Sequence, residues 1–249
     1  MARGSRGRES SRARRGPPPR LIRTETDSRA RPPGIVDHNR EAHEGRVRDL
    51  GSDHPDVLCS RDILARIYEK AGRLTEALDH FEQNLADAER VLGPDHHGAL
   101  IYRNSLAGAY GRAGRLTEAI DLFEQNLTNA ERVLGPVEIN TLYYRNGLAG
   151  AYEMAGRLTE AVGLYEQNLA EGGRGLCPGS LGMLQYRNSL AGAYEKVGRL
   201  SEAIGLYEQN LADAERLGVH DYSEAVFSRD NLAAARLLEG GVSSDRNDQ

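Results

Sequence analysis

The sequence contains no tryptophan, two cysteines and no long apolar run, and each of these shortages removes a class of protein. Cys59 and Cys177 cannot build a disulfide framework, so a reducing cytoplasm is the expected compartment. No stretch approaches the roughly 18 consecutive apolar residues of a membrane helix, and no secretory h-region follows the first residues. A membrane protein and a disulfide-stapled secreted domain are therefore not expected.

Lysine is also scarce, because Lys70 and Lys196 are the two lysines and the other 30 of the 32 basic residues are arginines. Residues 1–33 carry ten arginines and three acidic residues, a net charge of +7. Because the whole chain has a net charge of −5, the remaining residues carry −12. With five prolines and almost no apolar periodicity, this segment is predicted to be a disordered arm. Such an arm could contact nucleic acid through phosphate charge, although a solvated tail or an over-extended start of the reading frame is the preferred interpretation.

What the sequence has in abundance is repetition with a period of 42 residues. The heptapeptide Ala-Gly-Arg-Leu-Thr-Glu-Ala of residues 71–77 recurs at 113–119 and 155–161, and in a close variant at 197–203. The block Arg-Asn-Ser-Leu-Ala-Gly-Ala-Tyr of residues 103–110 recurs at 187–194 and with one change at 145–152, and more distantly at 61–68 and 229–236. A fixed period of this length indicates stacked structural units.

The predicted array covers residues 34–239 and is framed by two disordered segments. It comprises a half repeat over 34–56, full repeats over about 57–98, 99–140, 141–182 and 183–224, and a terminal helix over 225–239. Residues 240–249 are expected to be a disordered tail.

Each unit has the pattern of two amphipathic helices joined by a short turn. In the second unit a stripe at i, i+3, i+4 and i+7 predicts a first helix, helix A, over residues 98–112. The stripe consists of Arg103, Leu106, Ala107 and Tyr110. Gly114 suits a left-handed position after helix A, and Thr117 is expected to cap the second helix, helix B, which stops before Gly135. One such hairpin cannot cover its own apolar faces, so the units are expected to stack.

These residues resemble the tetratricopeptide repeat in its longer form, which occurs in kinesin light chain and in many bacterial repeat proteins. The resemblance rests on Leu106-Ala107-x-x-Tyr110, Gly114, Ala119, Phe123 and the connector Leu-Gly-Pro-Asp-His of residues 92–96. It implies an all-α fold, a TPR-type α-solenoid in which antiparallel helix pairs form a right-handed superhelix. It also implies a bacterial source and a concave wall, lined mainly by A helices, that binds peptide segments of partner proteins.

One position of helix A is polar in every copy and is the first candidate for contacts with a partner. Its members are Asp62, Asn104, Asn146, Asn188 and Asp230. The asparagines share a face with Gly108, Gly150 and Gly192, away from the Leu-Tyr stripe, so this face is expected to be polar and open. They would then form a ladder that fixes the backbone of an extended peptide. The alternative is that they bond to neighbouring helices and hold the repeat spacing.

An arginine precedes this position in every copy, at Arg61, Arg103, Arg145, Arg187 and Arg229. The arginines at 103, 145 and 187 are candidate groove residues, because a packed stem with an outward guanidinium would favour an acidic peptide. The preferred alternative is intramolecular pairing with glutamates of helix B. These glutamates are Glu124, Glu166 and Glu208.

The third repeat departs from the others near the end of its helix B. There Gly172, Gly173 and Gly175 replace alanine, glutamate and valine of the second repeat. Each glycine costs roughly 1 kcal/mol relative to alanine, so this helix is expected to fray after about Glu171.

No unrepeated group of residues indicates catalysis. Neither lysine lies in a phosphate-binding Gly-x-x-x-x-Gly-Lys-Ser/Thr motif, and no activating base can be named for either cysteine. His54, His96 and His97 lie in connectors and lack further ligands at metal-binding spacing. We therefore expect no enzymatic activity, no cofactor and no metal site.

The sequence thus predicts a non-catalytic scaffold that binds a partner peptide or helix in a concave groove. Two alternatives stay open at this point. One is a nucleic-acid-associated factor that uses residues 1–33, and the other is the detached sensor array of a larger bacterial regulator. Nucleic acid is expected to bind only through that arm, and no membrane contact is expected.

Overall fold

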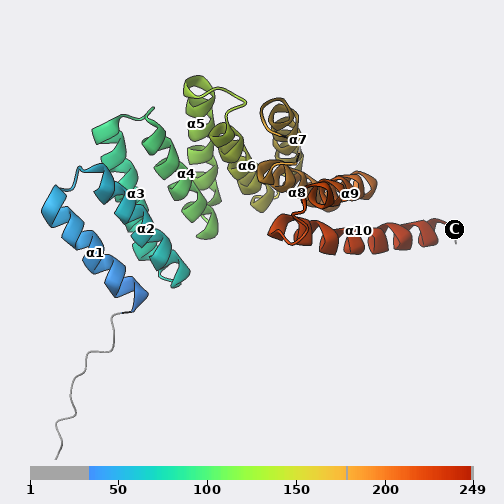
Figure 1. The fold of residues 1–249 in the computed structure, drawn as a ribbon, viewed down its shortest axis with the longest axis horizontal. Helices are drawn as coiled ribbons and strands as arrows, with labels where there is room; N and C mark the ends of the chain where they lie inside the picture. The colour runs from blue at the N-terminus through green and yellow to red at the C-terminus, as the bar shows by residue number, and fades with distance from the viewer. Residues whose placement is uncertain (1–33, 178, 248–249) are drawn as a thin grey trace, which may run out of the picture. The chain divides into compact units, whose positions relative to one another are not determined.

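Ten α-helices lie within residues 34–177 and 179–247, the part of the chain that the computed structural model describes. Their bounds are α1 (Ile35–Leu50), α2 (Pro55–Lys70), α3 (Leu74–Leu92), α4 (His97–Arg112), α5 (Leu116–Val133), α6 (Ile139–Met154), α7 (Leu158–Gly175), α8 (Leu181–Lys196), α9 (Leu200–Leu217) and α10 (Ser223–Asn247). Figure 1 shows these helices following one another in a row, and the described residues contain no strand. None of the helices in these ranges is both long and apolar enough to span a bilayer. The all-α prediction is confirmed.

The helices alternate in role along the row. Each helix packs against the next one in the chain, so the predicted pairs are α2 with α3, α4 with α5, α6 with α7, and α8 with α9. The even-numbered A helices also pack on one another from α2 to α10, whereas the odd-numbered B helices of the described chain do not. Because the A helices approach one another more closely, they line the inner side of an α-solenoid.

Pairs of alanines permit the close approach of the two helices in each repeat. They are Ala65, Ala107, Ala149 and Ala191 on the A helices, and Ala77, Ala119, Ala161 and Ala203 on the B helices. All are fully buried, and a larger side chain at these positions would separate the helix axes. A buried aromatic ring from each B helix fills the neighbouring volume, at Phe81, Phe123, Tyr165 and Tyr207.

The turn within each repeat follows the prediction at its glycine and departs from it at its threonine. Gly114 has a φ of +75°, a left-handed conformation that glycine adopts without strain. Thr117 is not the cap of α5, because the N-cap residue is Arg115, which forms no side-chain capping bond. Instead, the Arg115 guanidinium lies 4.0 Å from the centre of the Tyr110 ring and pairs with Glu118 at 3.0 Å. This hydrogen-bonded pairing lowers the pKa of Glu118.

The same stacked and paired arginine recurs in the other turns, at Arg73, Arg157 and Arg199. The repeated heptapeptide therefore encodes a complete turn: glycine provides the backbone reversal, arginine covers the tyrosine of helix A, and glutamate pairs with the arginine. The threonine contributes no capping bond to α3, α5 or α7.

The ends of the array differ from the predicted boundaries. α10 continues to Asn247, beyond the boundary placed at residue 239, and so differs from the tail predicted over 240–249. The arm predicted over residues 1–33 lies outside the described residues. Its disorder and its contact with nucleic acid stay predictions.

Helix B of the third repeat is longer than predicted. α7 passes Glu171 and ends at Gly175, so the expected early end is wrong. Packing explains the difference, because Gly172 is buried and a Cβ added there would lie 3.0 Å from the Met183 Sδ on α8. In the second repeat Ala130 takes the place of Gly172 and packs towards α6, where the residue equivalent to Met183 is the smaller Thr141. Methionine thus compensates for the missing methyl group of the glycine.

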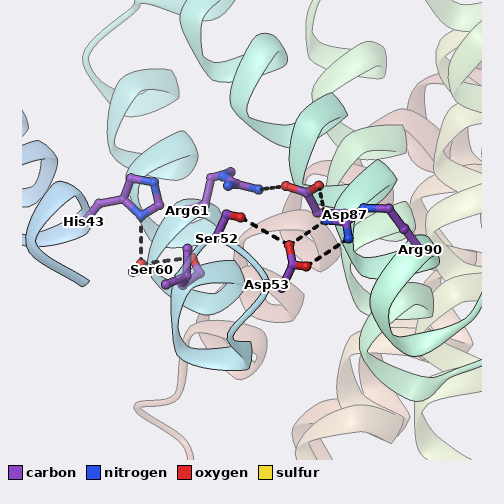
Figure 2. A network of polar contacts seen from close by, with 8 residues as sticks. His43, Ser52, Asp53, Ser60, Arg61, Asp87 and Arg90 are labelled. Carbon is purple, nitrogen blue, oxygen red and sulfur yellow. Dashed lines mark hydrogen bonds and ion pairs between the residues drawn. The ribbon is translucent and has the colours of Figure 1, made fainter. Parts of the chain in front are cut away.

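Near the start of the array, a polar network attaches the connector between α1 and α2 to helix α3 (Figure 2). Asp53 of the connector accepts hydrogen bonds from the Arg90 guanidinium at 2.6 and 3.0 Å. Asp87 joins this arginine, at 2.9 Å, to Arg61 of α2, at 2.6 Å. Helices α2 and α3 are therefore linked by an ion pair as well as through their apolar faces.

Helix α1 contributes one buried histidine to the same region (Figure 2). His43 Nδ1 lies 2.8 Å from the Ser60 Oγ, and the Ser60 hydroxyl itself donates to the Val57 carbonyl, so the imidazole N–H donates to Ser60. The ring centre of His80 on α3 lies 6.3 Å away. Burial, followed by the neighbouring Arg61, lowers the pKa of both histidines.

We predict that acidification loosens α1. Since the pKa of His43 is lower in the folded chain, its contribution to stability is present above about pH 6.5 and is lost as the pH falls through the folded value. Glu44 on α1 and Asp79 on α3 oppose this effect, and Arg46, Arg61 and His80 reinforce it. Hydrogen-exchange protection of α1 should fall between about pH 7.5 and about pH 5, relative to α5. His43→Gln should flatten that dependence and the exposed His97→Gln should not; an unchanged dependence in His43→Gln would contradict the assignment.

We also predict that the two adjacent glycines of α7 respond differently to alanine. Gly173 is exposed and nothing lies within 4 Å of an added Cβ, so Gly173→Ala should stabilise the chain by about 0.5 to 1 kcal/mol. Gly172→Ala should gain less, because its methyl group must displace Met183. Urea unfolding followed by circular dichroism measures both changes, and equal gains would show that the Met183 contact is unimportant.

Candidate functional site

The candidate arginines lie inside the helix packing and not on the groove surface. Arg61, Arg103, Arg145 and Arg187 are exposed by 4%, 4%, 0% and 3%. The expectation that the guanidinium groups at 103, 145 and 187 reach outward is therefore wrong. The physical reason is that neighbouring carboxylates hold each buried charge. The pairs are Arg61 with Asp87 at 2.6 Å, Arg103 with Glu89 at 2.5 Å, Arg145 with Glu131 at 2.7 Å and Glu171 at 2.8 Å, and Arg187 with Asp213 at 2.8 Å.

The partners of these arginines also differ from the predicted glutamates. Those glutamates, Glu124, Glu166 and Glu208, instead face the A helix of the following repeat. Glu124 accepts a hydrogen bond from the Tyr152 hydroxyl at 2.5 Å. The equivalent bonds join Tyr194 to Glu166 at 2.7 Å and Arg236 to Glu208 at 2.6 Å. The arginines are thus paired within the chain, as the preferred alternative predicted, but with other carboxylates than the predicted glutamates.

The aspartate and asparagine position of the A helices has four different environments. Asn188 is 8% exposed and fully bonded, since its Nδ2 donates to the Glu224 carbonyl at 2.9 Å and its Oδ1 accepts from Ser228 at 2.7 Å. Asp62 pairs with Arg66 at 2.7 Å, and Asp230 is exposed. Asn104 and Asn146 share a groove on the A-helix wall. Asn188 therefore fits the structural alternative.

The groove between α4 and α6 has a volume of about 510 Å³. Asn104 and Asn146 line it together with Gly108, Gly147 and Gly150. A Cβ on Gly147 would lie 2.8 Å from the Phe123 ring, so this glycine makes room for Phe123 within the wall. At Gly108 and Gly150, which carry no side chain, the backbone of a bound segment can approach the A helices closely. The groove thus places two side-chain amides beside a floor that includes two glycines.

The amide oxygens of the groove asparagines are buried within the wall. Asn104 Oδ1 and Asn146 Oδ1 are buried, and neither forms a hydrogen bond within the described chain. The Nδ2 atoms of Asn126 and Asn168, which belong to the B helices of the same repeats, are also buried and unpaired there. In the fourth repeat the equivalent atoms are bonded, because Asn210 Nδ2 donates to Asn188 Oδ1 at 2.8 Å. The asparagine of the B helix thus faces the oxygen of the A-helix asparagine, which leaves the Nδ2 of the A-helix asparagine as a donor in the groove.

Charged side chains at the edge of the groove are paired with one another. Arg66 donates to Asp62 and, at 2.8 Å, to the Ser105 hydroxyl. Arg112 pairs with Glu69 at 2.5 Å, and Lys196 pairs with Glu153. Each cation lies against a carboxylate of the same wall, so the groove has little excess charge of either sign. The acidic-peptide preference expected from the arginine row loses its basis.

Sequence reasoning missed an exposed position three residues before the asparagines. Its members change in every repeat: Cys59, Ile101, Tyr143, Gln185 and Phe227. Tyr143 is 51% exposed and lines the large groove, and Phe227 is 49% exposed and lines the next hollow with Asn188. The signal in the sequence was a position of helix A at which all five copies differ.

The histidines of the connectors act as helix caps. His54 Nδ1 accepts the backbone N–H of Asp56 at 3.1 Å, and His96 Nδ1 accepts that of Gly98 at 3.0 Å. Within residues 34–177 and 179–247, no group of histidine, cysteine, aspartate and glutamate side chains could hold a metal ion. Both cysteines are free and exposed.

Comparisons with known proteins agree with this geometry. A family model described as tetratricopeptide repeat matches residues 56–125 and 99–170, and a second model of that description matches residues 188–218. No curated protein matches the chain.

Solved structures extend the likeness over most of the array. The nearly identical TPR-like repeats assigned to a kinesin light chain of Podosopora anserina, crystallised as a variant with one substitution, are 31% identical with a TM-score of 0.64. That match covers 74% of this chain and 86% of the other. The same repeats without the substitution are 32% identical with a TM-score of 0.62, and that match covers 73% of this chain and 86% of the other. BtubC from P. vanneervenii is 19% identical over 72% of each chain with a TM-score of 0.62, a likeness of fold alone.

We predict that the buried arginine of the third repeat is essential for stability. Arg145→Ala leaves Glu131 and Glu171 without their cation and opens a cavity, so the free energy of unfolding should fall by about 3 to 5 kcal/mol. Arg229→Ala is the matched control, since this arginine has the same place in its helix but is exposed and unpaired in the described chain. It should change stability by less than about 0.5 kcal/mol. Similar losses in urea unfolding of the two variants would contradict a special role for the buried pair.

Proposed function

The chain belongs to the tetratricopeptide repeat family, and on that premise we propose that it is a non-catalytic scaffold whose groove binds a peptide segment of a partner protein. Tetratricopeptide repeats generally mediate protein–protein interactions, and scaffolds of this fold are typically not enzymes. The two free cysteines support a reducing compartment such as the cytoplasm.

A bond formed within the array carries the proposal. Asn188 Nδ2 donates to the main-chain carbonyl of Glu224 at 2.9 Å. The asparagine position of an A helix is thus able to bind a backbone carbonyl. Asn104 and Asn146 have the same place in their helices, and in the described chain neither side chain has a hydrogen-bond partner.

In the proposed complex, an extended segment lies along the A-helix wall. Its carbonyl groups accept hydrogen bonds from the Nδ2 groups of Asn104 and Asn146, and its backbone lies over the glycines of the floor. These contacts are independent of the partner's side chains. Selectivity comes from the variable residues, of which Tyr143 is 51% exposed and lines the groove.

The test is a double substitution of the groove asparagines. Partners that the wild-type chain captures are identified, and their affinities are measured by calorimetry against Asn104→Ala/Asn146→Ala. Loss of two hydrogen bonds should weaken binding by about 1 to 3 kcal/mol. Asn188 is left intact because it holds α10.

Asn129→Ala, on the B helix of the second repeat, is the matched control and should bind as the wild type does. Circular dichroism should show the same helix content in all variants. Full affinity in the double variant would remove the groove asparagines from the binding site.

A further inference from the structure

Helix α10 is an A helix without the B helix that accompanies the other A helices. In the four full repeats, α3, α5, α7 and α9 each cover one side of the A helix before them. α10 packs on α8 and α9, and within residues 34–177 and 179–247 no helix follows it (Figure 1). One side of this helix therefore lacks its usual cover.

The uncovered side carries the residues that the other repeats bury. Ala233 is exposed, whereas Ala65, Ala107, Ala149 and Ala191 at the same position are fully buried. Arg229 is likewise exposed and forms no ion pair in the described chain, whereas its four counterparts are paired inside the helix packing. We call this stripe, Arg229 with Ala233 and Leu237, the open face of α10.

The end of this face is more apolar than in any other A helix. Leu237 is 79% exposed and Leu238 is 58% exposed. The residues equivalent to Leu237 are Glu69, Gly111, Glu153 and Glu195, and those equivalent to Leu238 are Lys70, Arg112, Met154 and Lys196. Six of these eight equivalent residues are charged, which suits contact with water. Leucine in their place indicates a surface that is covered when the protein is at work.

The chain itself shows what covers such a face. In the fourth repeat, Arg187 donates to Asp213 at 2.8 Å and to the Asn210 amide oxygen at 3.1 Å, both on the B helix α9. Ala191 of α8 and Ala203 of α9 lie in one buried cluster. Arg61 and Arg145 are likewise paired with a carboxylate of the B helix that follows them. An unpaired arginine next to an uncovered alanine therefore fits a helix with a carboxylate and a small residue at the same spacing.

A second copy of this chain does not supply that helix. The one B helix without an A helix before it in the described chain is α1. At the positions of Asp213 and Ala203 the repeat period places Gly45 and Ile35 in α1. It thus lacks the carboxylate for Arg229 and presents a large side chain to Ala233.

We propose that the open face of α10 binds one amphipathic helix of a partner protein in the place of a B helix. A carboxylate of that helix pairs with Arg229, a small residue packs on Ala233, and apolar side chains cover Leu237. This surface is separate from the groove, so it provides the scaffold with a second binding site whose ligand is a helix.

The probe is a synthetic peptide of residues 200–217, the sequence of α9, with a hydrocarbon staple joining positions 205 and 209, both exposed on α9. The staple reduces the cost of ordering an isolated helix. We expect the fluorescently labelled peptide to bind the full chain with one-to-one stoichiometry. Arg229→Ala should weaken binding at least tenfold, and Ala233→Arg should abolish it.

A double-mutant cycle tests the predicted pair. Replacing Asp213 by alanine in the peptide should weaken binding to the wild type at least fivefold, and should have no further effect on binding to Arg229→Ala. Asp230→Ala, one residue away but on the groove side, and Asn104→Ala/Asn146→Ala should bind as the wild type does. These two variants separate the open face from the groove, so either site can fail without the other.

Four results would overturn the proposal. The first is that the stapled peptide does not bind, and the second is that a scrambled stapled peptide binds equally well. The third is that binding is lost in Asp230→Ala and retained in Arg229→Ala, which would place the peptide in the groove. The fourth is a dimer in sedimentation that Arg229→Ala dissociates, which would place a second copy of the chain on α10.

Discussion

A buried guanidinium in each full repeat is the interaction on which the rest of the array depends. A charge taken out of water is costly unless carboxylates neutralise it, and removing one partner of such a pair leaves an uncompensated charge. Asp87, Glu171 and Asp213 neutralise the arginine of the A helix from the B helix of the same repeat. In these three repeats the pairing fixes the register of the two helices, and the buried alanines permit their close contact. Arg103 of the second repeat instead pairs with Glu89 on α3, the B helix of the first repeat.

The register of the arginine determines what the next residue does. Because neighbouring residues of a helix point in directions about 100° apart, an arginine buried against helix B turns the following asparagine toward the A-helix wall. A second asparagine on helix B then faces its oxygen, as the bonded pair Asn210 and Asn188 shows. The donors of the groove are therefore a consequence of the core, while Tyr143 and the other members of its variable position are free to differ between repeats. The same reasoning applies to α10, where the arginine has no B helix to pair with.

Repetition made most of the fold predictable from the sequence. The period placed the helix pairs, and the glycine of each turn could be assigned its left-handed conformation, because both depend on residues close together in the chain. Burial of the arginines could not be predicted in this way, since it depends on a carboxylate 26 residues later, as for Arg61 and Asp87. Asn188 is sealed by Ser228 of the next A helix, and Gly172 is tolerated because of Met183, so both outcomes depend on contacts between repeats. Residue type alone suggests a capping role for Thr117, but stacking of Arg115 on Tyr110 governs that turn.

The orientation of the groove asparagines is tested most directly by NMR measurement of side-chain amide hydrogen exchange in the free protein. The Nδ2 hydrogens of Asn104 and Asn146 should exchange rapidly, because they face the groove. Those of Asn126 and Asn168, whose side chains are fully buried, should be strongly protected. Equal protection of all four amides would mean that Asn104 and Asn146 are sealed within the array, and the wall of A helices would then have no donors to offer a partner.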